Sequence, residues 1–300
     1  MGTNSEKLPI SSCGGRSDEG PSRSLYLGAV PLAPSYQRGP AVYIIANLYK
    51  NITEHEHISL GGHKDCESVK EWAKRLTRGS KTDIYVSTDA DVDEIRPVLK
   101  NCGDGPTFVY LNGHTEWSAE KKSYLATEYS APTKDVPGVV KGVPFEIMRE
   151  WIIGASPGPM DLLLVTDICF CPNFLRLPYL ARKVDGVWVW IKTEYYTEES
   201  SSYWEDKNIL HFAATDEDGE AYEWESIGGI HTREFCNVKP NVSLRSRLDD
   251  MQCSIDRIVS EFADGATQHA PLYSSYEADF EDKHIFKSII HTEWPVNWNS

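Results

Sequence analysis

The stretch Leu162-Leu163-Leu164-Val165-Thr166-Asp167-Ile168-Cys169 decides the fold class of this 300-residue chain. A short, continuous apolar run of this kind is typical of a strand buried on both faces. The run ends in an acidic residue and a cysteine. We therefore expect a strand over residues 161–166 that brings Cys169 to the edge of a sheet.

The same pattern occurs upstream, where apolar runs alternate with segments of helical periodicity. We expect strands at 41–47, 83–88 and 106–111, and helices from Asp65 onward, at 92–99 and at 144–153. Strands that alternate with helices are typical of a parallel sheet covered on both faces. The sequence therefore predicts an α/β fold, a three-layer sandwich with a mostly parallel central sheet.

The two ends of the chain are less regular. Residues 1–40 contain 18 Gly, Ser and Pro residues, a composition that predicts a flexible extension. The second half predicts strands at 187–191 and 209–214, an exposed acidic connection at 194–208, and a helix at 245–262.

Charge and cysteine content narrow the function classes. The formal net charge of −15 would repel phosphate-rich partners, so we expect no nucleic acid and no membrane as partner. The acidic balance fits a basic substrate, and it also fits a merely soluble surface. The seven scattered cysteines form no even disulfide framework, and the first residues have no apolar signal core, so we expect a cytoplasmic protein.

Two strand ends carry chemically active side chains. The predicted strand at 106–111 leads to His114, which lies 55 positions before Cys169. A cysteine nucleophile needs a base nearby, and the carboxyl ends of parallel strands meet at one edge of a sheet. The spacing is that of the caspases, whose histidine lies about 50 residues upstream of the cysteine.

The residues around this pair resemble the metacaspases, above all the short-form fungal and protist type. Those enzymes carry Tyr-Ser-Gly-His-Gly at one strand end and Asp-Ser-Cys-His-Ser-Gly followed by Leu-Pro-Tyr at the other. The matching stretches here are residues 111–115 (Leu-Asn-Gly-His-Thr) and residues 167–179, which run from Asp-Ile-Cys to Leu-Pro-Tyr without gaps. The resemblance covers about residues 41–184 and extends loosely over the rest.

The resemblance implies a caspase-like fold and a cysteine endopeptidase. His114 would be the general base and acid, and Cys169 the nucleophile. The backbone N–H groups of Thr115 and Cys169 would form the oxyanion hole. Asp65 and Asp167 would line the S1 pocket for Arg or Lys, since a carboxylate pair is a natural acceptor for a guanidinium group.

The resemblance also implies an organisation and a set of partners. We expect a peptide or protein substrate with a basic P1 residue, a monomer, and no cofactor or metal. The family's calcium site has an Asp where this chain has Arg176, so we do not expect calcium activation through it. The expected parts are a large-subunit-like part at 41–193, the connection at 194–208 and a small-subunit-like part at 209–300.

Departures from the family pattern favour an alternative. Thr115 replaces a glycine, and Phe170-Cys171-Pro172 replaces His-Ser-Gly. A caspase-fold regulator that binds partners without catalysis is therefore the rival hypothesis, and an acidic scaffold with no site is a third. Cys169 could then be a small buried residue.

Other candidate residues have plainer interpretations. Asp65 could simply cap its helix, and Cys171 is expected to be structural. The histidines at 55, 57 and 63 are expected to lie in a solvated loop, not at a metal. The acidic run at 216–225 is either a solvated turn or a wall of the substrate cleft.

Overall fold

The computed structural model describes residues 41–49, 62–76, 82–102, 105–117, 122–130, 139–154, 158–224, 227–237, 242–262 and 265–283. The chain divides into two compact units, residues 1–36 and 37–300, and every described residue belongs to the second. The predicted extension at 1–40, together with His55 and His57, lies outside the described residues.

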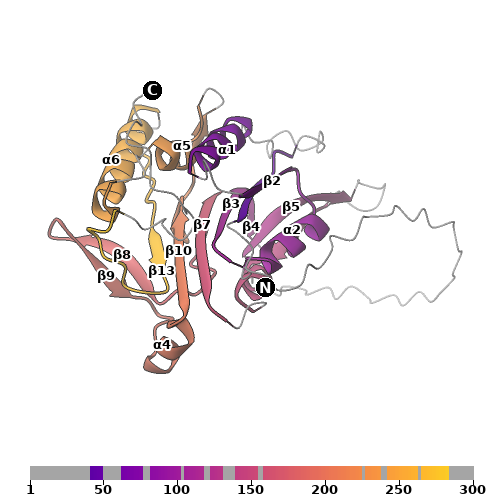
Figure 1. Ribbon diagram of the computed structural model, residues 1–300. Coiled ribbons are helices and arrows are strands. Elements are labelled where there is room, and N and C mark those ends of the chain that lie inside the picture. Colours follow the sequence, from indigo (N-terminus) through magenta and orange to yellow (C-terminus); the bar gives the residue numbers. More distant parts are fainter. Residues whose placement is uncertain are drawn as a thin grey trace, which may run out of the picture. The chain divides into compact units, whose positions relative to one another are not determined.

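An eight-stranded sheet forms the centre of the described part, in the order β2-β1-β3-β7-β10-β13-β8-β9 (Figure 1). The strands are β1 (Ala41–Ala46), β2 (Asp83–Thr88), β3 (Thr107–Gly113), β7 (Met160–Ile168), β10 (Lys207–Ala213), β13 (Leu272–Ser274), β8 (Tyr179–Val184) and β9 (Val187–Lys192). From β2 to β10 all pairings are parallel, and from β10 to β9 all are antiparallel. The carboxyl ends of β1, β3, β7 and β10 therefore meet at one edge.

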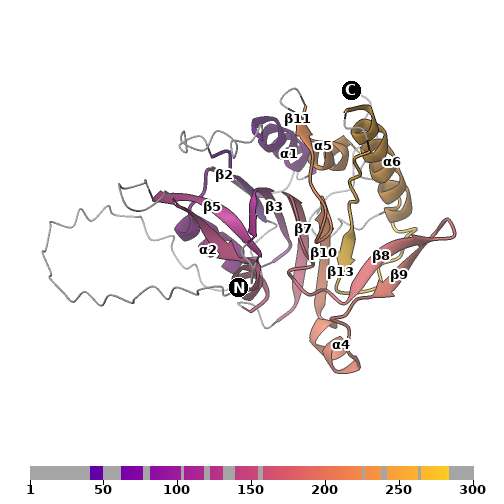
Figure 2. The ribbon, with the colours of Figure 1, turned by 180° about the vertical axis from the view of Figure 1, so that it is seen from behind.

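Helices cover both faces of the sheet (Figures 1 and 2). One face packs against α1 (His63–Leu76), α5 (Ile230–Asn237) and α6 (Leu244–Phe262); the other packs against α2 (Val92–Lys100), α3 (Phe145–Arg149) and a π-helical turn (Glu150–Gly154). Alternate residues of β3 enter the two cores, since Phe108 packs with Trp72 and Val109 lies in the opposite cluster. The predicted three-layer α/β sandwich is confirmed.

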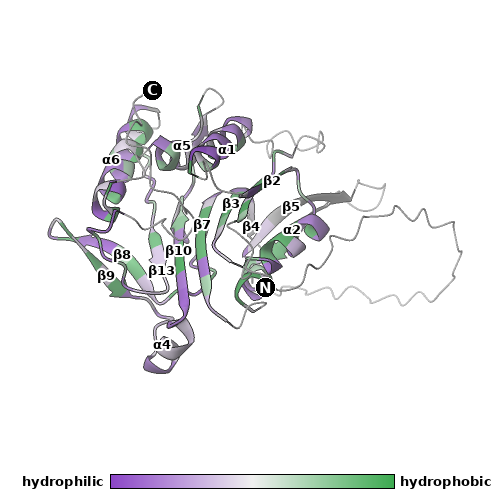
Figure 3. Ribbon diagram, in the orientation of Figure 1, coloured by the Kyte–Doolittle hydropathy of each residue, from purple (hydrophilic) through white to green (hydrophobic). Residues whose placement is uncertain are grey.

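Hydropathy follows this layering. Figure 3 shows mostly apolar residues along β7, whereas its neighbour β10 is hydrophilic at its amino end. The continuous apolar run of β7, residues 162–165, is explained by burial on both faces. Among the described residues, none of the helices is both long and apolar enough to cross a membrane.

Two regions contain more structure than the sequence predicts. The polar stretch after His114 forms a second sheet of β4 (Thr115–Trp117), β5 (Lys122–Ser130) and β6 (Val139–Pro144). The predicted connection at 194–208 contains α4 (Glu198–Trp204). Thr197 begins this helix with a capping box, in which its hydroxyl accepts from the Ser200 N–H and the Ser200 hydroxyl accepts from the Thr197 N–H.

Candidate functional site

His114 and Cys169 follow the ends of two neighbouring strands. β3 pairs in parallel with β7, and Gly113 lies opposite Ile168 in the register. The next residue on each strand is therefore His114 and Cys169, and both side chains are half-buried. The hydroxyl of Thr115 donates to the Cys169 carbonyl at 2.7 Å, which joins the two strand ends directly.

The backbone turn after Cys169 is strained. Phe170 has φ +52°, in the left-handed region, which costs a residue with a Cβ roughly 1–2 kcal/mol. Its N–H donates to the Gly219 carbonyl at 2.7 Å, and the next N–H, of Cys171, donates to the Thr215 hydroxyl at 3.3 Å. These bonds from the segment after β10 hold the turn in place. Strain of this kind, stabilised by surrounding contacts, is characteristic of functional sites.

The Cys169 thiol contacts the backbone of Ala221. Its Sγ lies 3.3 Å from the Ala221 N–H and 3.5 Å from the Ala221 carbonyl. Burial raises the pKa of Cys169 above its usual value, and the carboxylates of Asp167, Glu220 and Glu223 raise it further. The protonated thiol is therefore favoured in this state, and reaction requires a base to take its proton.

The His114 side is held by a tyrosine. The backbone N–H of His114 donates to the Tyr49 hydroxyl at 2.9 Å. The two rings are stacked, with centroids 5.3 Å apart and an interplanar angle of 26°. Tyr49 is buried and comes from the segment that follows β1.

Asp65 and Asp167 converge on the same face of the sheet. Asp65 accepts from the Gly229 N–H with both oxygens, at 2.9 and 3.0 Å. Asp167 accepts from the N–H and the hydroxyl of Thr232, at 3.1 and 2.5 Å. Both carboxylates are buried, with 1% and 5% of the residue exposed. Burial raises the pKa of each, and the charge of Asp167 raises that of Asp65 further.

The cover over these carboxylates requires two glycines. Gly228 and Gly229 form β12 (Gly228–Gly229), which pairs with β11 (Glu223–Trp224). A Cβ on Gly228 would overlap Asp65 Oδ1, and one on Gly229 would overlap Asp167 Oδ2. The absence of side chains there lets the backbone and the start of α5 contact both carboxylates.

The alternative interpretation of Asp65, as the cap of its own helix, is wrong. α1 begins at His63, so Asp65 is the third helical residue and not the one that precedes the helix. Its carboxylate accepts from Gly229, 164 residues away, and not from its own first turn. The predicted pair of Asp65 and Asp167 is thus close together, although both are already hydrogen-bonded.

The remaining candidates lie near the site or away from it. Cys171 is fully buried and contacts the Thr166 hydroxyl at 3.4 Å, as expected of a structural residue. Arg176 is exposed, with its guanidinium over the Tyr195 ring. The described part of the 216–225 run passes Cys169 through Gly219 and Ala221 and is therefore more than a solvated turn. In the described ranges no group of three His, Cys, Asp or Glu side chains could hold a metal.

Sequence reasoning missed Tyr49, Gly229 and Thr232. Tyr49 follows a predicted strand, so its place at the carboxyl edge could have been inferred from the sheet. The paired glycines at 228 and 229 were a visible signal of close backbone approach. Nothing local in the sequence indicates that Thr232 would bind Asp167.

A crystal structure of caspase-1 from Spodoptera frugiperda is similar to the chain. The TM-score is 0.46 at 12% sequence identity, and the match covers 80% of this chain and 87% of that one. No protein-family model and no curated protein matches the sequence.

Proposed function

We propose that the chain is a cysteine endopeptidase of the metacaspase-like type that cleaves peptide bonds after Arg or Lys. The observation that carries this proposal is the register of β3 and β7, in which His114 and Cys169 follow paired strand ends. The nearby carboxyl groups of Asp65 and Asp167 support a basic P1 residue, because a guanidinium or ammonium group can donate to both and favours their ionised form.

Peptide cleavage then proceeds in two balanced steps. His114 takes the thiol proton of Cys169, and the sulfur forms a bond to the scissile carbonyl carbon. The N–H groups of Thr115 and Cys169 stabilise the oxyanion. When the C–N bond breaks, His114 donates the proton to the leaving amine. A water molecule, deprotonated by His114, then attacks the thioester and releases the acid and the thiol.

Substrate binding exchanges one set of donors for another. The guanidinium or ammonium group of P1 would replace N–H groups of Gly229 and Thr232 as the partner of the acidic pair. A cation also favours the ionised form of both carboxylates, so binding of the basic side chain would release any proton that they share.

The competing function is a caspase-fold protein that binds partners without catalysis. The contact of Ala221 with the Cys169 thiol favours it, as does the raised pKa of that thiol. An Arg-directed peptide with a thiol-reactive group distinguishes the two. Labelling of Cys169 in the folded protein supports the peptidase, and its absence supports the competitor.

Replacement of the nucleophile is the decisive experiment. Cys169→Ala should lower kcat/KM for an Arg-containing fluorogenic peptide by at least about 10³-fold, because the acyl intermediate forms on the Cys169 sulfur. Cys253→Ala is the matched control, since Cys253 is an exposed free cysteine on α6. Full hydrolysis by Cys169→Ala would show that the proposal is wrong.

A further inference from the structure

We propose that Tyr49 is a positioning residue that sets both the orientation and the basicity of His114. This role rests on the proposed function of His114 as the base. Tyr49 contacts His114 in two independent ways, through the backbone N–H and through the face of the ring. Loss of one contact leaves the other, so the two effects can be separated by substitution.

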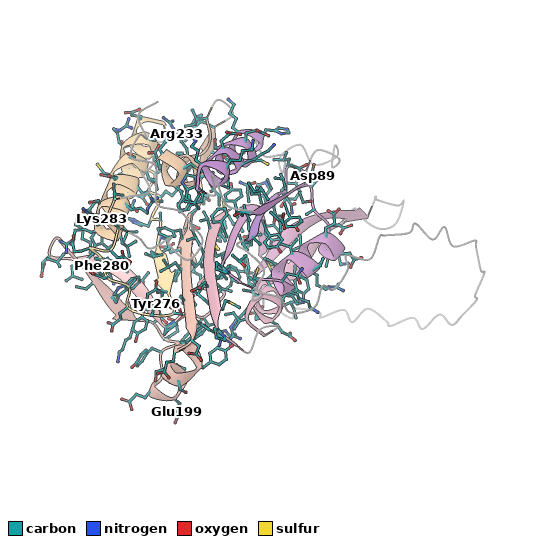
Figure 4. All side chains as sticks on the ribbon, in the orientation of Figure 1. Asp89, Glu199, Arg233, Tyr276, Phe280 and Lys283 are labelled. Carbon is teal, nitrogen blue, oxygen red and sulfur yellow. The ribbon has the colours of Figure 1, made fainter. Side chains whose placement is uncertain are left out.

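Tyr49 is held in an unusual backbone conformation. Its φ of +53° lies in the left-handed region, which is uncommon for an aromatic residue. The two preceding residues are fixed to the turn after β2, because Asp89 accepts from the Leu48 N–H at 2.8 Å and Asn47 accepts from the Ala90 N–H at 2.9 Å. Asp89 is labelled in Figure 4. The surrounding structure therefore stabilises a conformation that places the phenol beside His114.

A second tyrosine fixes the backbone on the other side of the same turn. Tyr124, on β5, donates its hydroxyl proton to the Asn112 carbonyl at 2.9 Å. A Cβ on Gly113 would lie 2.8 Å from the Tyr124 ring and 2.9 Å from the Tyr49 hydroxyl. Gly113 is thus enclosed between the two tyrosines, and residues 112–114 have little freedom to move. Any other residue at 113 would have to displace one phenol.

The ring contact adds an electrostatic effect. An aromatic face attracts a cation, so a stacked phenol stabilises the imidazolium form over the neutral ring. Tyr49 would therefore raise the basicity of His114 at the moment when it holds the Cys169 proton. The hydroxyl contact has a different consequence, since it fixes the backbone and hence the direction in which the imidazole points.

NMR in the Cys169→Ala background tests the role without any peptidase activity. Tyr49→Leu should lower the pKa of His114, followed by the chemical shift of its ring C–H, by about half a pH unit. Tyr49→Phe keeps the ring, so it should preserve this titration and raise the hydrogen-exchange rate of the His114 amide about tenfold. Tyr124→Phe is the matched control, because it removes one buried hydroxyl from the same turn without touching His114.

The outcomes separate the two proposals. An unchanged titration in Tyr49→Leu, or an unchanged amide exchange rate in Tyr49→Phe, overturns the positioning role. If Tyr49→Leu does not fold, the exchange rate in Tyr49→Phe decides alone. Equal titration shifts in Tyr49→Leu and Tyr124→Phe would also overturn it, because a general loosening of the turn would explain both. If the expected shifts occur but native Cys169 supports no hydrolysis, the effect of Tyr49 on the orientation and pKa of His114 stands, and the peptidase function with His114 as its base fails.

Discussion

Cys169 and Asp167 lie two residues apart, yet their surroundings differ. The Cys169 thiol is half-buried and contacts one backbone unit, that of Ala221. Asp167 is buried, accepts two hydrogen bonds from Thr232, and lies beside a second carboxylate at Gly229. The Cys169 thiol therefore has only weak contacts, whereas backbone and hydroxyl donors of the chain already bind Asp65 and Asp167. Reactivity and specificity should therefore be separable by substitution.

Among variants that keep Cys169, the largest effect is expected from Asp167→Asn. It removes a buried carboxylate from the proposed S1 pocket, so kcat/KM for Arg-containing peptides should fall by about 10²-fold or more. The amide oxygen can still accept from Thr232, so the fold should be kept. Alkylation of Cys169 by iodoacetamide should continue, and this combination would confirm that specificity is lost without reactivity.

The matched control is Asp161→Asn, at the other end of β7, where the carboxylate accepts from Asn208. Equal losses of kcat/KM in both variants would contradict an S1 role for Asp167. A preference for Arg that survives in Asp167→Asn would contradict it as well.

The start of α5, which donates hydrogen bonds to Asp167, should make the stability of the fold sensitive to acid. His231, in the first turn of α5, is fully buried, and neither ring nitrogen has a partner among the described residues. Burial lowers its pKa to about 3. Below pH 6.5 the unfolded chain binds a proton there that the folded chain does not, so the free energy of unfolding decreases as the pH falls toward 3.

His231→Leu should remove the share of this sensitivity that His231 contributes and gain about 2 kcal/mol of stability at pH 5 relative to pH 8. The buried His211, whose pKa is also lowered to about 3, keeps its own share. Urea unfolding of both proteins at the two pH values measures it. His269→Leu, at an exposed histidine, is the control. An identical pH dependence in His231→Leu and the native chain would mean that His231 is solvated.

The smallest effect concerns the acidic pair itself. The pKa of Asp65 is raised by burial and by Asp167. The folded chain therefore binds a proton at pH values where the unfolded chain has released it, and the free energy of unfolding falls as pH rises above about 4. Asp65→Asn removes this loss and should stabilise the protein by about 1 kcal/mol or more at pH 8. Thermal unfolding at pH 5 and 8 tests this, with the exposed Asp93→Asn as control.

The elements that the sequence predicts well are those whose burial produces a local run of apolar residues. The runs at 106–111 and 161–166 indicate β3 and β7, and their order along the chain brings His114 and Cys169 to one edge. The contacts missed were long-range. Asp65 looked like a helix cap because only its own helix is visible locally, whereas its partner Gly229 lies in another element. The β4–β6 sheet was missed because polar residues interrupt its strands, so that none has a long continuous apolar run.

The contact of Ala221 with the Cys169 thiol forms late when the chain is synthesised on the ribosome, because Ala221 follows Cys169 by 52 residues. Chains emerge from the ribosome amino end first. When β9 has emerged, His114 and Cys169 are both outside the ribosome. The residues that contact the thiol and the two carboxylates, namely Ala221, Gly229 and Thr232, have not yet emerged. A nascent chain that pauses at that length carries an uncovered cysteine and two carboxylates without their donors. The unfinished chain is thus the form most open to oxidation and to unintended partners.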